Sequence, residues 1–229
     1  NQTRILFDFG IRAKRDCRAV IEHITRNCGP LSAVMVSHLH GDHLSPYGQA
    51  VLAEAGVPLY LPREAVHHAK SDSPVDTHRY SIHPFAIGTF TIQPVRVRHA
   101  PTHPTYGFVV SCLHAGIPRK ICLFTDLCRW TEEMVIHLTD ADFAFLESNH
   151  ARNLLRLPPN YASRIHLPNP HTSLWIRTAL NRSRALPKAI MLGHLSEERN
   201  TPELALAAIR AALDDIERFR DLLLLVAPR

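Results

Sequence analysis

The most informative motif of this sequence is the run His38-Leu39-His40-Gly41-Asp42-His43. It follows residues 33–37, which read as a buried strand, and it precedes Pro46, which suits the first position of a helix. His38 and His40 stand two residues apart, so both can point to one side where the strand ends. Asp42 and His43 come from the turn and can reach a second point nearby. Imidazole and carboxylate suit zinc, manganese or iron, and two ions about 3.5–4 Å apart can share a hydroxide. The run therefore predicts a two-metal hydrolytic site.

Further ligands are expected where other apolar strands end in a polar residue. His99 follows Val95-Arg96-Val97-Arg98, Asp126 follows Leu123-Phe124-Thr125, and His194 follows residues 190–193. Taken singly, such a residue is more often a cap or a turn residue than a ligand. Three of them in one chain with the histidine run favour a complete metal site over a polar loop.

Apolar periodicity predicts alternating strands and helices along most of the chain. Strands are expected at residues 5–9, 33–37, 58–61, 89–97, 106–113, 120–125, 142–146, 189–192 and 222–226. Helices are expected at residues 12–27, 46–56, 63–70, 131–138 and 172–183, and from Thr201 onward. Residues 151–170 are basic and rich in proline, without a clean period. The alternation with interspersed hairpins predicts a mixed sheet with helices outside it.

The composition is that of a globular protein. The chain has 229 residues, of which 45% are hydrophobic and 21% charged, and it contains sixteen histidines. Its net charge of +5 suits an anionic substrate. The five cysteines are odd in number and form no Cys-x-x-Cys pair, so we expect free thiols and a cytoplasmic location. No apolar run approaches the eighteen or so residues that span a bilayer, so no membrane partner is expected.

Two longer motifs carry a resemblance to a known family. They are Leu146-Glu147-Ser148-Asn149-His150 and Leu192-Gly193-His194-Leu195-Ser196-Glu197-Glu198-Arg199-Asn200. With the histidine run, they make the chain resemble the metallo-β-lactamase-fold hydrolases, and within them the WalJ/YycJ-like branch of exonucleases. The resemblance implies an α/β fold, a metallo-β-lactamase-like αββα four-layer sandwich with mixed sheets. We expect residues 1–229 to form a single such domain, with N-terminal strands of the domain preceding Asn1.

The resemblance also implies roles for the ligands. The first metal would be held by His38, His40 and His99, and the second by Asp42, His43 and His194, with Asp126 bridging them. Asp42 and Asp126 would be catalytic residues as well as ligands, and Asp8 would order the ligand loop. The segment His99-Ala100-Pro101 departs from the His-Asp-Ala of the branch, and the spacing from His99 to Gly107 is long. His103 is therefore a rival to His99, which we favour because it directly ends a strand.

The mechanism that the resemblance implies is attack on phosphorus by a hydroxide that bridges the metals. His150 or His171 would protonate the leaving alkoxide or bind the scissile phosphate. Arg152, Arg156 and Arg164 could follow a nucleic-acid backbone, although a charge run is more often a solvated face. Ala151 replaces the aspartate that the branch often has after its Asn-His pair, so the substrate-facing part departs from the family pattern.

The sequence thus predicts a metal-dependent phosphodiesterase or exonuclease acting on DNA or RNA. The expected cofactors are two divalent metal ions, zinc first, with manganese or iron as alternatives. The same fold hosts hydrolases of small phosphodiesters and thioesters, so hydrolysis of such a small molecule stays an alternative prediction. A non-catalytic, metal-stabilised binding module is a third reading, but structural zinc sites favour cysteine ligands, and no cysteine lies near the expected ligands. A redox di-iron site is disfavoured because His40 is not a glutamate and no flavin domain is present.

Overall fold

The structure is a computed structural model that describes residues 3–67, 75–155 and 161–228. The chain forms two compact units. The first unit comprises Asn1–Arg96 and Pro101–Tyr106, and the second comprises Val97–Ala100 and Gly107–Arg229.

A parallel sheet forms the centre of the first unit. Its strands run in the order β1 (Ile5–Phe7), β2 (Ala33–Met35), β3 (Leu59–Pro62) and β4 (Thr77–Tyr80). All three residues of β2 are fully buried, as expected for a parallel strand covered on both faces. β4 was not predicted, because it lacks the apolar residues that mark a buried strand: three of its four residues are exposed or half-buried.

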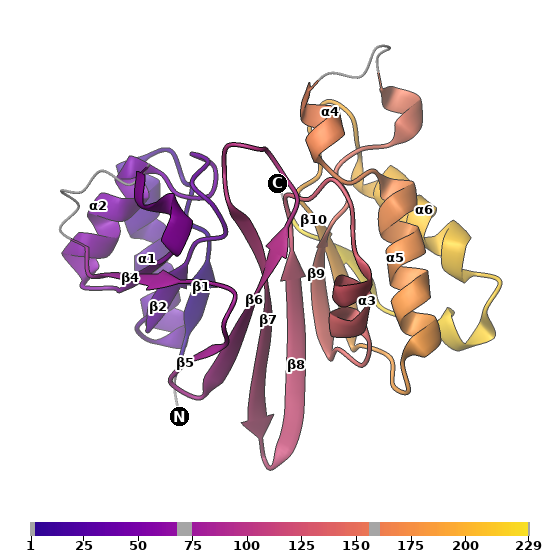
Figure 1. The fold of residues 1–229 in the computed structure, drawn as a ribbon, viewed down its shortest axis with the longest axis horizontal. Coiled ribbons are helices and arrows are strands. Elements are labelled where there is room, and N and C mark those ends of the chain that lie inside the picture. Colours follow the sequence, from indigo (N-terminus) through magenta and orange to yellow (C-terminus); the bar gives the residue numbers. More distant parts are fainter. Residues whose placement is uncertain (1–2, 68–74, 156–160, 229) are drawn as a thin grey trace. The chain divides into compact units, whose positions relative to one another are not determined.

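Two helices of the first unit pack beside this sheet, α1 (Lys14–Cys28) and α2 (Pro46–Ala55) (Figure 1). The expected start of α2 is confirmed: Pro46 opens the helix, and the Ser45 hydroxyl accepts a hydrogen bond from the Gly48 amide at 2.8 Å. The expected helix at 63–70 is a 3-10 helix over Arg63–His67 in its described part, and residues 68–70 lie outside the described residues. β5 (Phe85–Ile87), which was not predicted, pairs with β6 (Phe90–Val97) antiparallel.

A mixed sheet forms the centre of the second unit. Within this unit its strands lie in the order β11 (Leu224–Val226), β10 (Ala189–Gly193), β9 (Phe143–Glu147), β8 (Ile117–Phe124) and β7 (Thr105–His114), and the order of the sheet continues with β6 and β5. β7 and β8 form the expected hairpin, and the neighbours from β8 to β11 are parallel. The hairpin turns on Ala115 and Gly116, with φ of 51° and 76°. A turn of two residues with positive φ is tight, so β8 begins three residues earlier than predicted.

The helices of the second unit are α3 (Glu132–Leu138), α4 (Tyr161–Ile165), α5 (Asn169–Arg182) and α6 (Pro202–Leu213), with 3-10 turns at Arg152–Leu154 and Glu217–Phe219. α5 and α6 pack against each other beside β9 and β10 (Figure 1). Trp175 of α5 is fully buried and meets Phe124 of β8 edge to face at 5.5 Å between ring centroids. α5 thus covers the sheet with its apolar face.

The segment 151–170 is where the sequence was least informative. It contains the 3-10 turn at Arg152–Leu154, helix α4 and the start of α5, while residues 156–160 lie outside the described part. α5 begins three residues before the predicted Thr172, because Pro170 stands in the first turn, where a proline is compatible with a helix. This places His171 in the first turn of α5.

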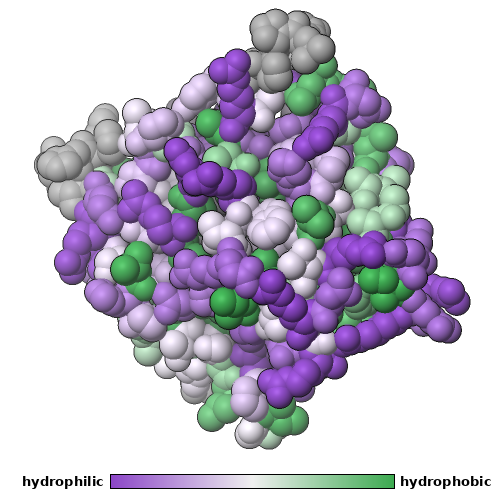
Figure 2. Space-filling view, turned by 45° about the vertical axis from the view of Figure 1, so that its right-hand side comes forward, coloured by the Kyte–Doolittle hydropathy of each residue, from purple (hydrophilic) through white to green (hydrophobic). Residues whose placement is uncertain are grey.

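Hydrophilic side chains predominate on the face drawn in Figure 2, and apolar side chains there are mostly scattered. Among the described helices, none is both long and apolar enough to cross a membrane. The predicted α/β class with mixed sheets is confirmed. The single domain over residues 1–229 stays a prediction.

Candidate metal centre

The histidine run follows β2 and forms a turn of the first unit whose side chains range from buried to exposed. His38 is fully buried and His43 is 6% exposed, whereas the Asp42 side chain is 55% exposed. The turn is closed by hydrogen bonds from the amides of His43 and Leu44 to the His40 carbonyl, both at 3.0 Å. His38 Nε2 lies 2.8 Å from His40 Nδ1 and the two rings meet edge to face, so both side chains point to one side as the spacing predicted.

Asp8 ties this turn to the end of β1. Its Oδ1 accepts from the Ser37 amide at 2.7 Å, and its Oδ2 contacts the Ser37 hydroxyl at 2.9 Å and His43 Nδ1 at 2.8 Å. A carboxylate at Nδ1 fixes the proton there and leaves Nε2 as the nitrogen that can bind a metal. His43 Nε2 lies 3.7 Å from Asp42 Oδ2. These contacts are those expected of a residue that orders the ligand loop.

The two rivals for one ligand position fall in different units. His103 belongs to the first unit, where its ring centroid lies 4.3 Å from that of His40 and its Nδ1 contacts the Thr102 hydroxyl at 2.8 Å. His99 belongs to the second unit, where its side chain is 1% exposed. Its Nδ1 lies 3.1 Å from the Ile165 carbonyl, so this nitrogen donates and Nε2 is the available one.

Three parallel strands of the second unit end in residues with polar side chains at one edge of the sheet. Asp126 comes two residues after β8, Glu147 is the last residue of β9, and His194 directly follows β10. The register pairs Phe124 with Leu146 and Gly193 with Glu147, so the three strand ends are level. Asp126 and His194 have φ of 58° and 55°, a conformation that is uncommon outside glycine and that concentrates at functional sites.

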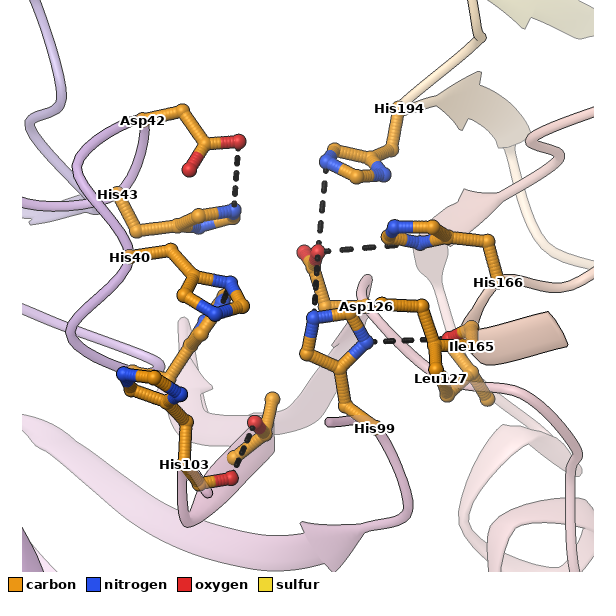
Figure 3. Close-up of polar contacts among 12 residues, drawn as sticks. His40, Asp42, His43, His99, His103, Asp126, Leu127, Ile165, His166 and His194 are labelled. Carbon is orange, nitrogen blue, oxygen red and sulfur yellow. Dashed lines mark hydrogen bonds and ion pairs between the residues drawn. The ribbon is translucent and has the colours of Figure 1, made fainter. Parts of the chain in front are cut away.

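The donor atoms of this second unit surround one carboxylate oxygen (Figure 3). Asp126 Oδ1 lies 3.4 Å from His194 Nε2 and 3.7 Å from His99 Nε2. Burial lowers the pKa of His99, which favours the neutral imidazole that a metal requires. Neutral imidazoles and a carboxylate are a donor set that fits zinc, manganese or iron.

Sequence reasoning missed two residues of this group, Glu147 as a functional side chain and His166. Glu147 is fully buried, and its Oε1 contacts His166 Nδ1 at 2.6 Å and His194 Nδ1 at 3.0 Å. Its Oε2 accepts from the amides of Leu127 at 2.9 Å and Leu167 at 3.3 Å. Burial raises the pKa of Glu147, but the hydrogen bonds from His166 and His194 outweigh it, and the pKa is lowered.

Glu147 and His166 differ in whether a sequence pattern could have pointed to them. Glu147 ends an apolar strand as the predicted ligands do, so the rule applied to Asp126 and His194 could have found it. His166 follows the short helix α4, within the aperiodic segment 151–170. We find no pattern in the sequence that singles it out from the other histidines.

The surroundings of His150 and His171 do not favour the role of proton donor that the sequence led us to expect. His150 is 2% exposed, its Nδ1 lies 3.3 Å from Asn149 Oδ1, and burial lowers its pKa to about 4. His171 accepts a hydrogen bond from the Arg152 guanidinium at 2.7 Å, and burial and Arg152 together lower its pKa. Both histidines are therefore held in the uncharged form, which does not favour proton donation at neutral pH.

The basic residues of segment 151–170 are exposed where the structure describes them. Arg152 and Arg164 are both at the surface of the second unit, and Arg156 lies outside the described residues. The Arg199 side chain contacts the Ser163 hydroxyl at 2.8 Å, which attaches α4 to the loop that follows His194.

The comparison with known proteins agrees with this geometry. A β-lactamase superfamily domain matches residues 3–191. The chain is 29% identical over 224 residues to the exodeoxyribonuclease WalJ of Streptococcus pneumoniae, covering 90% of this chain and 78% of that protein. It is 25% identical over 229 residues to the exodeoxyribonuclease YycJ of Bacillus anthracis, covering 94% of this chain and 83% of that protein.

Solved structures show the same fold. The metallo-β-lactamase fold protein YhfI of Bacillus subtilis superimposes with a TM-score of 0.69 at 16% identity, covering 97% of this chain and 83% of that one. With the superfamily match spanning most of the sequence, the protein belongs to the β-lactamase superfamily and has the metallo-β-lactamase fold.

Proposed function

We propose that the protein is a metal-dependent exonuclease that hydrolyses phosphodiester bonds of DNA or RNA. The observation that carries this proposal is the second unit's donor group, in which Asp126 Oδ1 lies 3.4–3.7 Å from the Nε2 atoms of His194 and His99. Two relatives over most of the chain are named exodeoxyribonucleases, which makes DNA the first substrate to test.

The proposed cofactors are two divalent metal ions, with zinc as the first candidate and manganese or iron as alternatives. Their ligands are proposed to be His38, His40, Asp42, His43, His99, Asp126 and His194. Bound ions of this kind supply Lewis acidity and make water a nucleophile near neutral pH. The five cysteines are all free and lie outside the candidate ligand groups of the described residues, which speaks against a closed structural zinc site.

The chain's own residues hold and orient the reacting groups. Asp8 and Glu147 keep the Nδ1 protons of His43 and His194 in place, so Nε2 of each imidazole is available. Arg152 and Arg164 are proposed to contact phosphates of the substrate strand. His150 and His171 remain candidates for binding the scissile phosphate, and their lowered pKa values make protonation of the leaving group the less favourable of their two expected roles. The free thiols agree with the proposed cytoplasmic location.

A substrate comparison tests the proposal. The metal-loaded protein is incubated with 5′-labelled single-stranded DNA, with RNA of the same sequence, with bis(p-nitrophenyl) phosphate and with a thioester. We expect stepwise shortening of a nucleic acid and none with Asp126→Asn. Cleavage of the small diester or the thioester alone would contradict the exonuclease proposal and identify a small-molecule hydrolase instead.

A further inference from the structure

His166 lies inside the second unit's group of donor side chains. Its ring centroid is 4.9 Å from that of His99 and 4.9 Å from that of His194. The side chain is 13% exposed, and Figure 3 shows its ring directed toward Asp126 between the other two imidazoles. The superfamily pattern that gave the seven expected ligands does not include this residue.

Glu147 fixes which nitrogen of His166 can bind a metal. The contact of 2.6 Å between His166 Nδ1 and Glu147 Oε1 is a short, charge-assisted hydrogen bond. His194 makes the same contact through its own Nδ1, at 3.0 Å to the same oxygen. A histidine that ligates a metal commonly donates its other nitrogen to a carboxylate in this way. His166 and the expected ligand His194 are therefore held by one carboxylate in one tautomer.

The spacing of the donor atoms separates ligands from hydrogen-bond partners. With zinc bonds of 2.0–2.1 Å at tetrahedral angles, neighbouring ligand atoms lie about 3.3 Å apart. Asp126 Oδ1 lies 3.4 Å from His194 Nε2 and 3.7 Å from His99 Nε2, which approaches that spacing. The 3.9 Å from Asp126 Oδ1 to His166 is measured at Nδ1, the nitrogen next to Glu147, so it shows only that the His166 ring lies beside this carboxylate. The distance from His166 to Glu147 is too short for two ligands of one ion. Donor atoms of His99, Asp126 and His166 all lie within 4.8 Å of one another.

We propose that His166 is an additional metal ligand, so that the second unit by itself carries four donor side chains. They are His99, Asp126, His166 and His194. This proposal rests on the proposed metal-dependent function and deepens it. It predicts that the second unit retains one divalent ion after the ligands of the first unit have been removed.

The test starts from a full-length variant in which His38, His40, Asp42 and His43 are all replaced by alanine. Equilibrium dialysis with zinc, and cobalt(II) titration followed by visible absorption, count the bound ions and measure their affinity. The informative substitution in this background is His166→Asn. The amide nitrogen of asparagine sits near the position of Nδ1, so it can still donate to Glu147, but nothing replaces Nε2. His114→Ala is the control, because His114 is exposed at the end of β7.

We expect one bound ion in the four-alanine variant and in its His114→Ala control. His166→Asn should weaken binding by at least about 100-fold, since loss of a mere outer partner of a ligand already costs about 10–100-fold. The cobalt spectrum should change with it. No bound ion in the four-alanine variant, or a loss below tenfold with an unchanged spectrum, would overturn the proposal. If the four-alanine variant does not fold, the imidazole count from X-ray absorption of the zinc-loaded protein with and without His166→Asn decides in the same way. None of these readouts needs a substrate, so they stand apart from the nuclease assay.

Discussion

Two carboxylates hold the histidines of the candidate site by the same nitrogen. Asp8 contacts His43 Nδ1 at 2.8 Å in the first unit, and Glu147 contacts His194 Nδ1 at 3.0 Å in the second. Each carboxylate also accepts a backbone amide that borders a ligand, from Ser37 and from Leu127. A single side chain thus orients an imidazole and fixes the backbone beside a ligand, which explains why a precise donor arrangement is possible on loops.

Substitutions of Asp126 test the role of its carboxylate, which lies at the centre of the second unit's donor group. Asp126→Asn keeps the shape of the side chain and tolerates the φ of 58°, so the fold should persist while cleavage falls by about 1,000-fold or more. Asp126→Ala should lose activity to the same degree and also about 1–2 kcal/mol of stability, because alanine is strained in that conformation. Cleavage rates and urea unfolding measure the two effects. Wild-type activity in Asp126→Asn would refute the role.

The variant Glu147→Gln tests whether the buried Glu147 carboxylate holds its histidine partners in place. Because the folded-state pKa of Glu147 lies below its ordinary value of 4.5, the carboxylate contributes stability that is present above pH 4.5 and is lost as the pH falls through the lower folded value. Glu147→Gln should therefore cost about 1–3 kcal/mol at pH 7 and weaken metal binding about 10–100-fold. Urea unfolding of the metal-free proteins at pH 7 and at pH 3 should show the difference shrinking in acid. A difference that is constant with pH would count against this role.

At the scale of single residues, the sequence could predict candidate ligands that follow strands and could not predict a candidate that tertiary contact alone brings in. Asp126 and His194 follow recognisable apolar runs, and the structure places them together. His166 joins them only because the loop after α4 returns to the sheet edge, where the Leu167 amide reaches Glu147. A contact between an aperiodic segment and a strand residue twenty positions before it leaves no local pattern.

At the scale of elements, the end of β10 is tightly packed. A Cβ on Gly193 would lie 2.1 Å from Cζ of Phe145 on the neighbouring strand β9. Gly193→Ala should therefore displace either the ring or the strand end that carries His194, at a cost of about 1–3 kcal/mol. Gly41→Ala is the matched control, since nothing lies within 4 Å of a Cβ there. Urea unfolding compares the two variants, and equal stabilities would show that β10 does not constrain His194 in this way.

Helices with recognisable caps were predictable to within a few residues. α2 and α6 start where the Ser45-Pro46 and Thr201-Pro202 pairs indicate, because the hydroxyl satisfies an amide of the first turn. β4 and β5 were not predicted, since they are short and their residues are largely half-buried or exposed. Their pairing with β3 and β6 decides their conformation, and tertiary context of that kind overrides local preference.

At the scale of the whole molecule, the net charge of +5 raises the question of where a polyanion would bind. If Arg152 and Arg164 contact phosphates, Arg152→Gln with Arg164→Gln should reduce the slope of log K against log salt by about 1.4 for single-stranded DNA. Arg15→Gln with Arg184→Gln removes the same charge from side chains that are 93% and 92% exposed in other parts of the chain. Binding measured at several salt concentrations should give a smaller slope for the Arg152/Arg164 double variant than for the Arg15/Arg184 double variant. Equal slopes would argue against contacts of Arg152 and Arg164 with phosphates.

The fold was predictable because one motif is tied to one architecture, whereas the substrate depends on features that differ between relatives of the same fold. The histidine run and the strand-end residues indicate the candidate metal centre without reference to any substrate. The segment 151–170 has neither periodicity nor a motif, so its two short helical turns became visible only in the structure.

Metal-dependent hydrolysis is tested by measuring metal content and cleavage together. The purified protein is stripped with a chelator, and zinc or manganese is returned in steps while bound metal and release from 5′-labelled DNA are measured on the same samples. We predict no cleavage without metal and activity that rises with bound ion to a plateau at two equivalents. Full cleavage by the stripped protein, or no nucleic-acid cleavage at the plateau, would show that the protein is not a metal-dependent nuclease.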